Sequence, residues 1–214
     1  MNKIKALQSV NEIKELMERS SKFVSLSGLT GILVGSYSLT GAYIANQILI
    51  STNPHLKETI PILGMDISIQ VKQMIILALC ILIASIVSTI LISYRKAKKN
   101  GQKVFNKLVY RIIWSFAIPL ITGGLFCIAL LYHHHYGLTS SVMLLFYGLA
   151  LINVSKYTFS NAAYLGYCFL TLGIIDCFME KHAILFWAVG FGIFHILYGI
   201  LFYLQYERKK RLDD

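Results

Sequence analysis

The chain has 214 residues, of which 56% are hydrophobic and only 14% are charged, and its formal net charge is +10. This composition excludes an ordinary soluble domain and is typical of a helical bundle in lipid. The apolar runs are continuous and lack the ten-residue alternation of a membrane β-barrel. We therefore predict an all-α polytopic membrane protein.

Residues 1–22 form a polar segment that we predict to be a cytoplasmic amphipathic helix. Apolar side chains recur in it every three residues, and charged side chains fill the positions between them. Such spacing predicts a helix with one apolar face. Two interpretations stay open: the helix lies on the inner leaflet of the membrane, or it docks a partner protein or a second copy of the chain.

Uncharged stretches long enough to cross a bilayer follow, because about 20 apolar residues span about 30 Å of hydrocarbon. The stretch from Ile112 to Ser155 would extend about 66 Å as one helix, so it crosses twice and turns at residues 133–135. The predicted transmembrane domain covers residues 23–206, and a basic cytoplasmic tail covers residues 207–214. Its six predicted spans are Phe23–Ile50, Val71–Tyr94, Leu108–Tyr132, Leu138–Val154, Phe159–Phe178 and Ile184–Tyr206.

The basic residues predict the orientation of the spans. If the N-terminus is cytoplasmic, the cytoplasmic segments hold 17 of the 20 lysine and arginine residues, and only Lys57, Lys72 and Lys181 fall outside. Cytoplasmic loops carry such an excess, so both termini are expected inside the cell. The implied partners are the lipid bilayer and the anionic lipid headgroups at its inner face. No nucleic-acid-binding motif accompanies the charge, so no nucleic-acid partner is expected.

Small residues at helical spacing mark faces where helices pack closely. The first span carries Ser27, Gly31 and Gly35 on one face, and the sixth carries Gly192 and Gly199 on another. In lipid, such faces let two backbones approach and gain van der Waals contact. The neighbour of the first span is either another span of the same chain or a second copy in a homo-oligomer.

Four residues inside the spans are candidates for ligand binding. Asp176 is the acidic residue within a span and His195 the histidine at mid-bilayer, and ionisable groups there are costly unless they are paired, hydrated or neutral. Pro119 and Gly123 predict a kinked or locally broken third span, which often lines a cavity. The alternatives are a packing histidine satisfied by a tyrosine or a carbonyl group, an Asp176 that reaches water or pairs with a neighbour, and a kink without a ligand.

The outer histidines offer a weaker metal hypothesis. His133, His135 and His182 map to the outer side together with carboxylates, and imidazole plus carboxylate suits Zn²⁺ or Cu²⁺. No pair of histidines has the spacing that places both on one helical face, so a solvated polar turn is the favoured interpretation.

Three segments carry a resemblance: Glu15–Gly28, Phe146–Thr158 and Phe186–Gly199. Together they resemble uncharacterised six-span membrane proteins of bacteria across most of the chain. The resemblance implies a location in the bacterial cytoplasmic (inner) membrane, and it implies no activity.

Enzyme signatures are absent from the sequence: it has no GxSxG motif and no glycine-rich phosphate loop. We therefore predict a non-enzymatic integral membrane protein that binds or passes a small solute or ion, or that serves as a membrane sensor or scaffold subunit. The alternative is a metal-binding protein or metal-dependent membrane enzyme that uses the outer histidines. The sequence identifies no cofactor.

Overall fold

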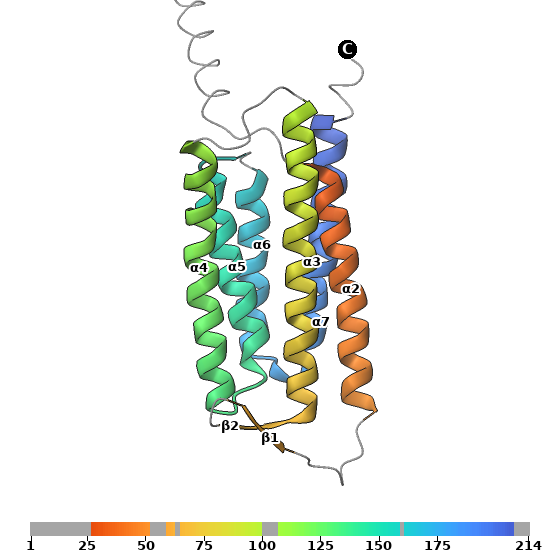
Figure 1. The fold of residues 1–214 in the computed structure, drawn as a ribbon, viewed down its shortest axis with the longest axis vertical. Helices are drawn as coiled ribbons and strands as arrows, with labels where there is room; N and C mark the ends of the chain where they lie inside the picture. Colours follow the sequence, from red (N-terminus) through yellow and green to blue (C-terminus); the bar gives the residue numbers. More distant parts are fainter. Residues whose placement is uncertain (1–26, 52–58, 63–64, 100–106, 159–160, 208–214) are drawn as a thin grey trace, which may run out of the picture.

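The computed structural model describes residues 27–51, 59–62, 65–99, 107–158 and 161–207 (Figure 1). The predicted amphipathic helix at residues 1–22 and nearly all of the basic tail lie outside these ranges, as does His55. The described part of the chain is a bundle of long helices that run roughly parallel or antiparallel to one another.

Each predicted span corresponds to a helix. Apolar runs fold this way because backbone groups in lipid must hydrogen-bond within their own segment. The last helix, which we call the C-terminal helix (residues 183–207), contains two π-helical stretches. The helices are α2 (Gly28–Ile50), α3 (Ile69–Lys99), α4 (Lys107–Tyr132), α5 (Leu138–Ser155) and α6 (Asn161–Cys177), then η1 (Glu180–His182), α7 (Ala183–Trp187), η2 (Ala188–Phe194), α8 (His195–Phe202) and η3 (Tyr203–Glu207).

Four of these helices are long and apolar enough to cross a membrane: α3, α4, α5 and the C-terminal helix with η1. Helix α6 has 17 residues and is a shorter apolar helix. Helix α2 has 23 residues, but glycine, serine and threonine dilute its apolar character. The helices therefore support a membrane-embedded protein.

A short hairpin between α2 and α3 departs from the all-helical prediction. Strands β1 (Thr59–Ile62) and β2 (Met65–Ser68) pair antiparallel, with Thr59 opposite Ser68 and Ile62 opposite Met65. The sequence analysis missed this hairpin because each strand has only four residues, too few for a clear alternating pattern.

The helices pack as a row rather than a closed ring. Helix α3 packs on α2, α2 packs on the C-terminal helix, and the C-terminal helix packs on α5 and α6 (Figure 1). Helix α4 completes the other end against α5. The main core lies where α5, α6 and the C-terminal helix meet, around Leu144, Leu151 and Phe169. Large apolar side chains on α3 and α4 point outward, as expected of surfaces that face lipid.

The local break predicted at Pro119 does not occur. Helix α4 is continuous from Lys107 to Tyr132 with Pro119 buried inside it. An internal proline removes one helical hydrogen bond and crowds the carbonyl group one turn earlier, yet this 26-residue helix continues through it. The irregular backbone lies instead in the C-terminal helix, where η2 is π-helical over Ala188–Phe194.

Candidate functional site

The small-residue face of α2 lies directly against the C-terminal helix of the same chain. A Cβ atom on Gly35 would stand 2.6 Å from the Gly192 carbonyl oxygen, and one on Gly31 would stand 2.9 Å from the His195 carbonyl oxygen. A Cβ atom on Gly199 would stand 2.5 Å from the Gly28 carbonyl oxygen. Ser27 immediately precedes α2 at the end of this contact. Of the two neighbours left open by the sequence, this face meets the span of its own chain.

His195 is buried beside this interface, with 6% of its surface exposed. Its Nε2 atom lies 2.7 Å from the Tyr147 hydroxyl group on α5, and its Nδ1 atom lies 3.4 Å from the Gly190 carbonyl oxygen. The carbonyl can only accept, so Nδ1 carries the proton and donates, and the Tyr147 hydroxyl donates to Nε2. A neutral imidazole therefore has both ring nitrogens satisfied.

The π-helical stretch η2 provides one of these two contacts. Gly190 precedes His195 by five residues, which is the spacing that a π-helix brings together. The rings of Phe169 and Phe191 surround the imidazole, with centroids 5.4 and 6.1 Å away. His195 thus links α5 to the C-terminal helix through a polar contact inside an aromatic cluster. The sequence suggested a tyrosine hydroxyl or a backbone carbonyl as the partner of His195, and both are present, but it did not indicate which tyrosine.

Asp176 lies in the last turn of α6, and none of its surface is exposed. The hydroxyl groups of Ser140 and Ser141, in the first turn of α5, lie beside its carboxyl group. The Ser140 hydroxyl donates to the Ala183 carbonyl oxygen at 2.9 Å. In the described part of the chain, neither carboxyl oxygen of Asp176 nor the Ser141 hydroxyl has a hydrogen-bond partner.

This environment differs from what the sequence suggested for Asp176. The sequence favoured contact with water or pairing with a neighbour such as Lys181 or His182, but the carboxyl group is enclosed and both of those side chains are exposed. The two serines were not singled out. In the sequence they are only two adjacent hydroxyl residues at the start of an apolar span. Their relation to Asp176 becomes visible only when α6 is seen to pack against α5.

Pro119 and Gly123 do not join either polar group. Both are buried, and a Cβ atom on Gly123 would stand 2.5 Å from the Cβ atom of Phe146 on α5. Gly123 therefore allows α4 to pack closely on α5. The structure distributes the candidate residues over separate contacts rather than one cavity.

The outer histidines are exposed and apart from the buried groups. His133, His135 and His182 are all exposed, and the neighbouring His134 contacts the Tyr136 hydroxyl group at 2.7 Å. His134 also has a positive φ of 61°, which closes the turn between α4 and α5. Within the described ranges, no three His, Cys, Asp or Glu side chains are close enough to hold a metal ion.

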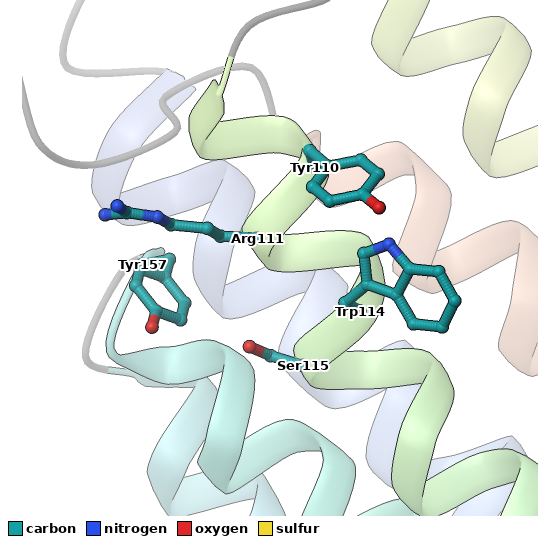
Figure 2. A pocket seen from close by; sticks show the side chains of 5 residues that line it. All are labelled: Tyr110, Arg111, Trp114, Ser115 and Tyr157. Atoms are coloured by element: carbon teal, nitrogen blue, oxygen red, sulfur yellow. The ribbon is translucent and has the colours of Figure 1, made fainter.

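A pocket of about 400 Å³ lies at the N-terminal end of α4 (Figure 2). Four of its lining residues belong to the first turns of α4, and the fifth, Tyr157, follows the end of α5. The sequence analysis treated Arg111 as one of many inner basic residues. The lining residues are Tyr110, Arg111, Trp114, Ser115 and Tyr157.

Comparison of this chain with protein-family models, with curated proteins and with solved structures finds no match. No residue role is therefore transferred from a relative, and the geometry alone must carry the function. Two features could bind a ligand: the enclosed Asp176 carboxyl group with its serine neighbours, and the pocket around Arg111.

Proposed function

We propose that this chain is a six-span protein of the bacterial inner membrane that binds a small cation at Asp176, as part of holding or passing that ion. Both termini are cytoplasmic in this proposal, and the predicted helix at residues 1–22 lies on the inner leaflet. The cation is of the alkali-metal class, which oxygen ligands hold without a dedicated set of histidines.

The observation that carries the proposal is the Asp176 carboxyl group, enclosed yet without a hydrogen-bond partner in the described part of the chain. Buried polar groups are almost always satisfied, and a buried charge is costly unless a counter-charge or donor compensates it. No described lysine, arginine or histidine does so here. A bound cation would compensate it.

The neighbouring atoms are chemically suited to a hard cation. The Ser140 hydroxyl donates its hydrogen bond to the Ala183 carbonyl oxygen, so the lone pairs on its own oxygen remain free to coordinate a cation. The Ser141 hydroxyl has no partner among the described residues. Two carboxylate oxygens and two hydroxyl oxygens thus offer four ligand atoms. The first turn of α5 adds the positive end of its helix dipole, which favours an ionised carboxylate.

The lengths of α2 and α6 support six spans. Helix α6 would extend about 26 Å from its 17 residues, close to the thickness of a bilayer core. Helix α2 would extend about 35 Å from its 23 residues. Asp176 would then lie near the outer end of its span, within reach of ions from outside. The basic residues at the C-terminal end of α3 and the N-terminal end of α4 support an inner location for the opposite end.

The test is the thermal stability of the purified full chain in detergent, titrated with NaCl, KCl or LiCl while choline chloride holds ionic strength constant. A cation at 100 times its Kd should stabilise the fold by about 2.7 kcal/mol. For a chain of this size, that corresponds to a rise in Tm of about 5–11 °C.

Asp176→Asn should abolish this response while leaving the variant at least as stable in choline chloride, because the uncompensated buried charge is gone. Ser141→Ala should weaken the response. Glu207→Gln is the matched control, since it makes the same carboxylate-to-amide change at the far end of the C-terminal helix and should retain the response. If the wild-type Tm is indifferent to all three cations, or if Asp176→Asn responds like wild type, the proposal is wrong.

A further inference from the structure

Every side chain that lines the pocket at the inner end of α4 can donate a hydrogen bond. The donors are the Arg111 guanidinium, the Tyr110, Tyr157 and Ser115 hydroxyls, and the Trp114 indole. No acidic side chain lines it. In the described part of the chain, no ion pair or hydrogen bond engages the Arg111 guanidinium. Hydrogen-bond donors and a positive charge without a carboxylate are suited to an anion.

The side chains of Arg111, Ser115 and Tyr157 lie on one side of α4, whereas the rings of Tyr110 and Trp114 project from the other side (Figure 2). Figure 2 shows Arg111 and Tyr157 extending side by side from α4 and from the segment after α5, with Ser115 directed toward Tyr157. The segment after α5 is held in place, because the Tyr157 amide donates to the Val154 carbonyl oxygen at 2.9 Å. The same oxygen accepts the buried Thr158 hydroxyl at 3.2 Å. The pocket wall is therefore part of the fold.

The pocket lies at the level along the helix axis where a lipid headgroup would be expected. Tyr110 and Trp114 are 64% and 47% exposed, and their rings pack edge to face with centroids 6.0 Å apart. Tyrosine and tryptophan concentrate at the membrane–water boundary, where their apolar rings and polar tips both find suitable surroundings. The uncharged run of α4 begins at Ile112, directly after Arg111. The guanidinium thus lies where the polar layer meets hydrocarbon.

We infer that this pocket binds a phosphate group, as carried by an anionic phospholipid headgroup or by a soluble phosphate ester. A guanidinium binds phosphate oxygens through two parallel hydrogen bonds, and the tyrosine and serine hydroxyls would donate to the remaining oxygens. The volume of about 400 Å³ accommodates the phosphate together with its glycerol group. The site is separate from Asp176 and does not depend on cation binding there.

The experiment uses the full chain in nanodiscs of phosphatidylcholine, with phosphatidylglycerol added in steps or with glycerol 3-phosphate added to the buffer. The readout is Tm together with the fluorescence of Trp114, in a Trp187→Phe background. Stabilisation by phosphatidylglycerol alone identifies the lipid as the source of the phosphate. Stabilisation by glycerol 3-phosphate as well identifies a soluble ester as a competent ligand.

Arg111→Gln should weaken the apparent affinity by about 10- to 100-fold, which is the usual effect of losing a hydrogen bond to a charged group. Arg95→Gln is the matched control, because Arg95 is also an exposed arginine and lies near the C-terminal end of α3 without lining the pocket. It should lose about fivefold at most, the contribution of one basic residue near an anionic surface. Tyr157→Phe should give an intermediate loss.

Equal losses in Arg111→Gln and Arg95→Gln would show that only general surface charge attracts the lipid, and would overturn the inference. So would an absence of any response to both phosphate compounds in the wild-type chain.

Discussion

Replacing Gly35 with alanine should push α2 away from the C-terminal helix. The added Cβ atom would lie 2.6 Å from the Gly192 carbonyl oxygen, 2.6 Å from the Ile196 Cγ1 atom and 3.0 Å from the Ile196 backbone nitrogen. Two of these atoms belong to the backbone and cannot rotate aside. The helices must therefore separate by about 0.8 Å, from 2.6 Å to the 3.4 Å at which ordinary contact begins.

Gly124→Ala, on α4 at the other end of the bundle, provides a matched control. A Cβ atom at Gly124 meets nothing within 4 Å, so alanine fits there without displacement. Both substitutions lie in helices and gain the same stabilisation from reduced backbone freedom, about 0.5–1 kcal/mol. The difference between the two variants therefore isolates the cost of overpacking, which is about 1–3 kcal/mol.

The measurement is Tm in a mild detergent, followed by tryptophan fluorescence, together with the elution volume on size exclusion. Gly35→Ala should melt about 2–12 °C below Gly124→Ala, since 1 kcal/mol shifts Tm by about 2–4 °C in a chain of this size. Gly35→Leu should extend the loss. If Gly35→Ala and Gly124→Ala melt together at or above the wild-type Tm, α2 does not pack on the C-terminal helix as described.

Two further predictions concern the buried histidine and the topology. His195→Phe should destabilise the fold by about 1–3 kcal/mol because it leaves the Tyr147 hydroxyl unpaired. The double variant Tyr147→Phe/His195→Phe should recover part of that loss. Denaturant titrations measure both effects, and strictly additive losses would contradict the hydrogen bond. In a chain whose four cysteines are replaced, His135→Cys should react with an impermeant maleimide in intact spheroplasts and Lys99→Cys should not; the opposite pattern would reverse the proposed orientation.

The positions of the helices could be read from local sequence, but not all of their ends: α3 continues to Lys99, five residues past the predicted Tyr94. The predicted span Leu138–Val154 and the observed α5, Leu138–Ser155, differ by one residue. The reason is physical: a helix in lipid satisfies its own backbone, so its limits depend on where apolar residues give way to polar ones. The turn at His133–His135 follows from the same local pattern, because polar residues interrupt the apolar run there.

The candidate sites depended on contacts between distant segments. Spacing alone marked the glycine face of α2, but its partner was decided by how the sixth span packs. Asp176 is separated by 35 positions from Ser141, and Arg111 by 46 from Tyr157. No periodicity in either helix records which neighbour it will meet, so neither pairing was predicted.

The sequence by itself determined that this is a helical protein suited to a membrane, where its helices lie along the chain, and which faces are small or polar. These are properties of a segment and its solvent, and hydrophobicity and charge encode them directly. Only the tertiary structure decided that Tyr147 and Gly190 satisfy the hydrogen bonds of His195 and that Asp176 is enclosed beside two serines. It also decided that Arg111 lines a pocket with other hydrogen-bond donors. Those outcomes depend on which helices become neighbours and in what register, and packing complementarity across the whole bundle sets both.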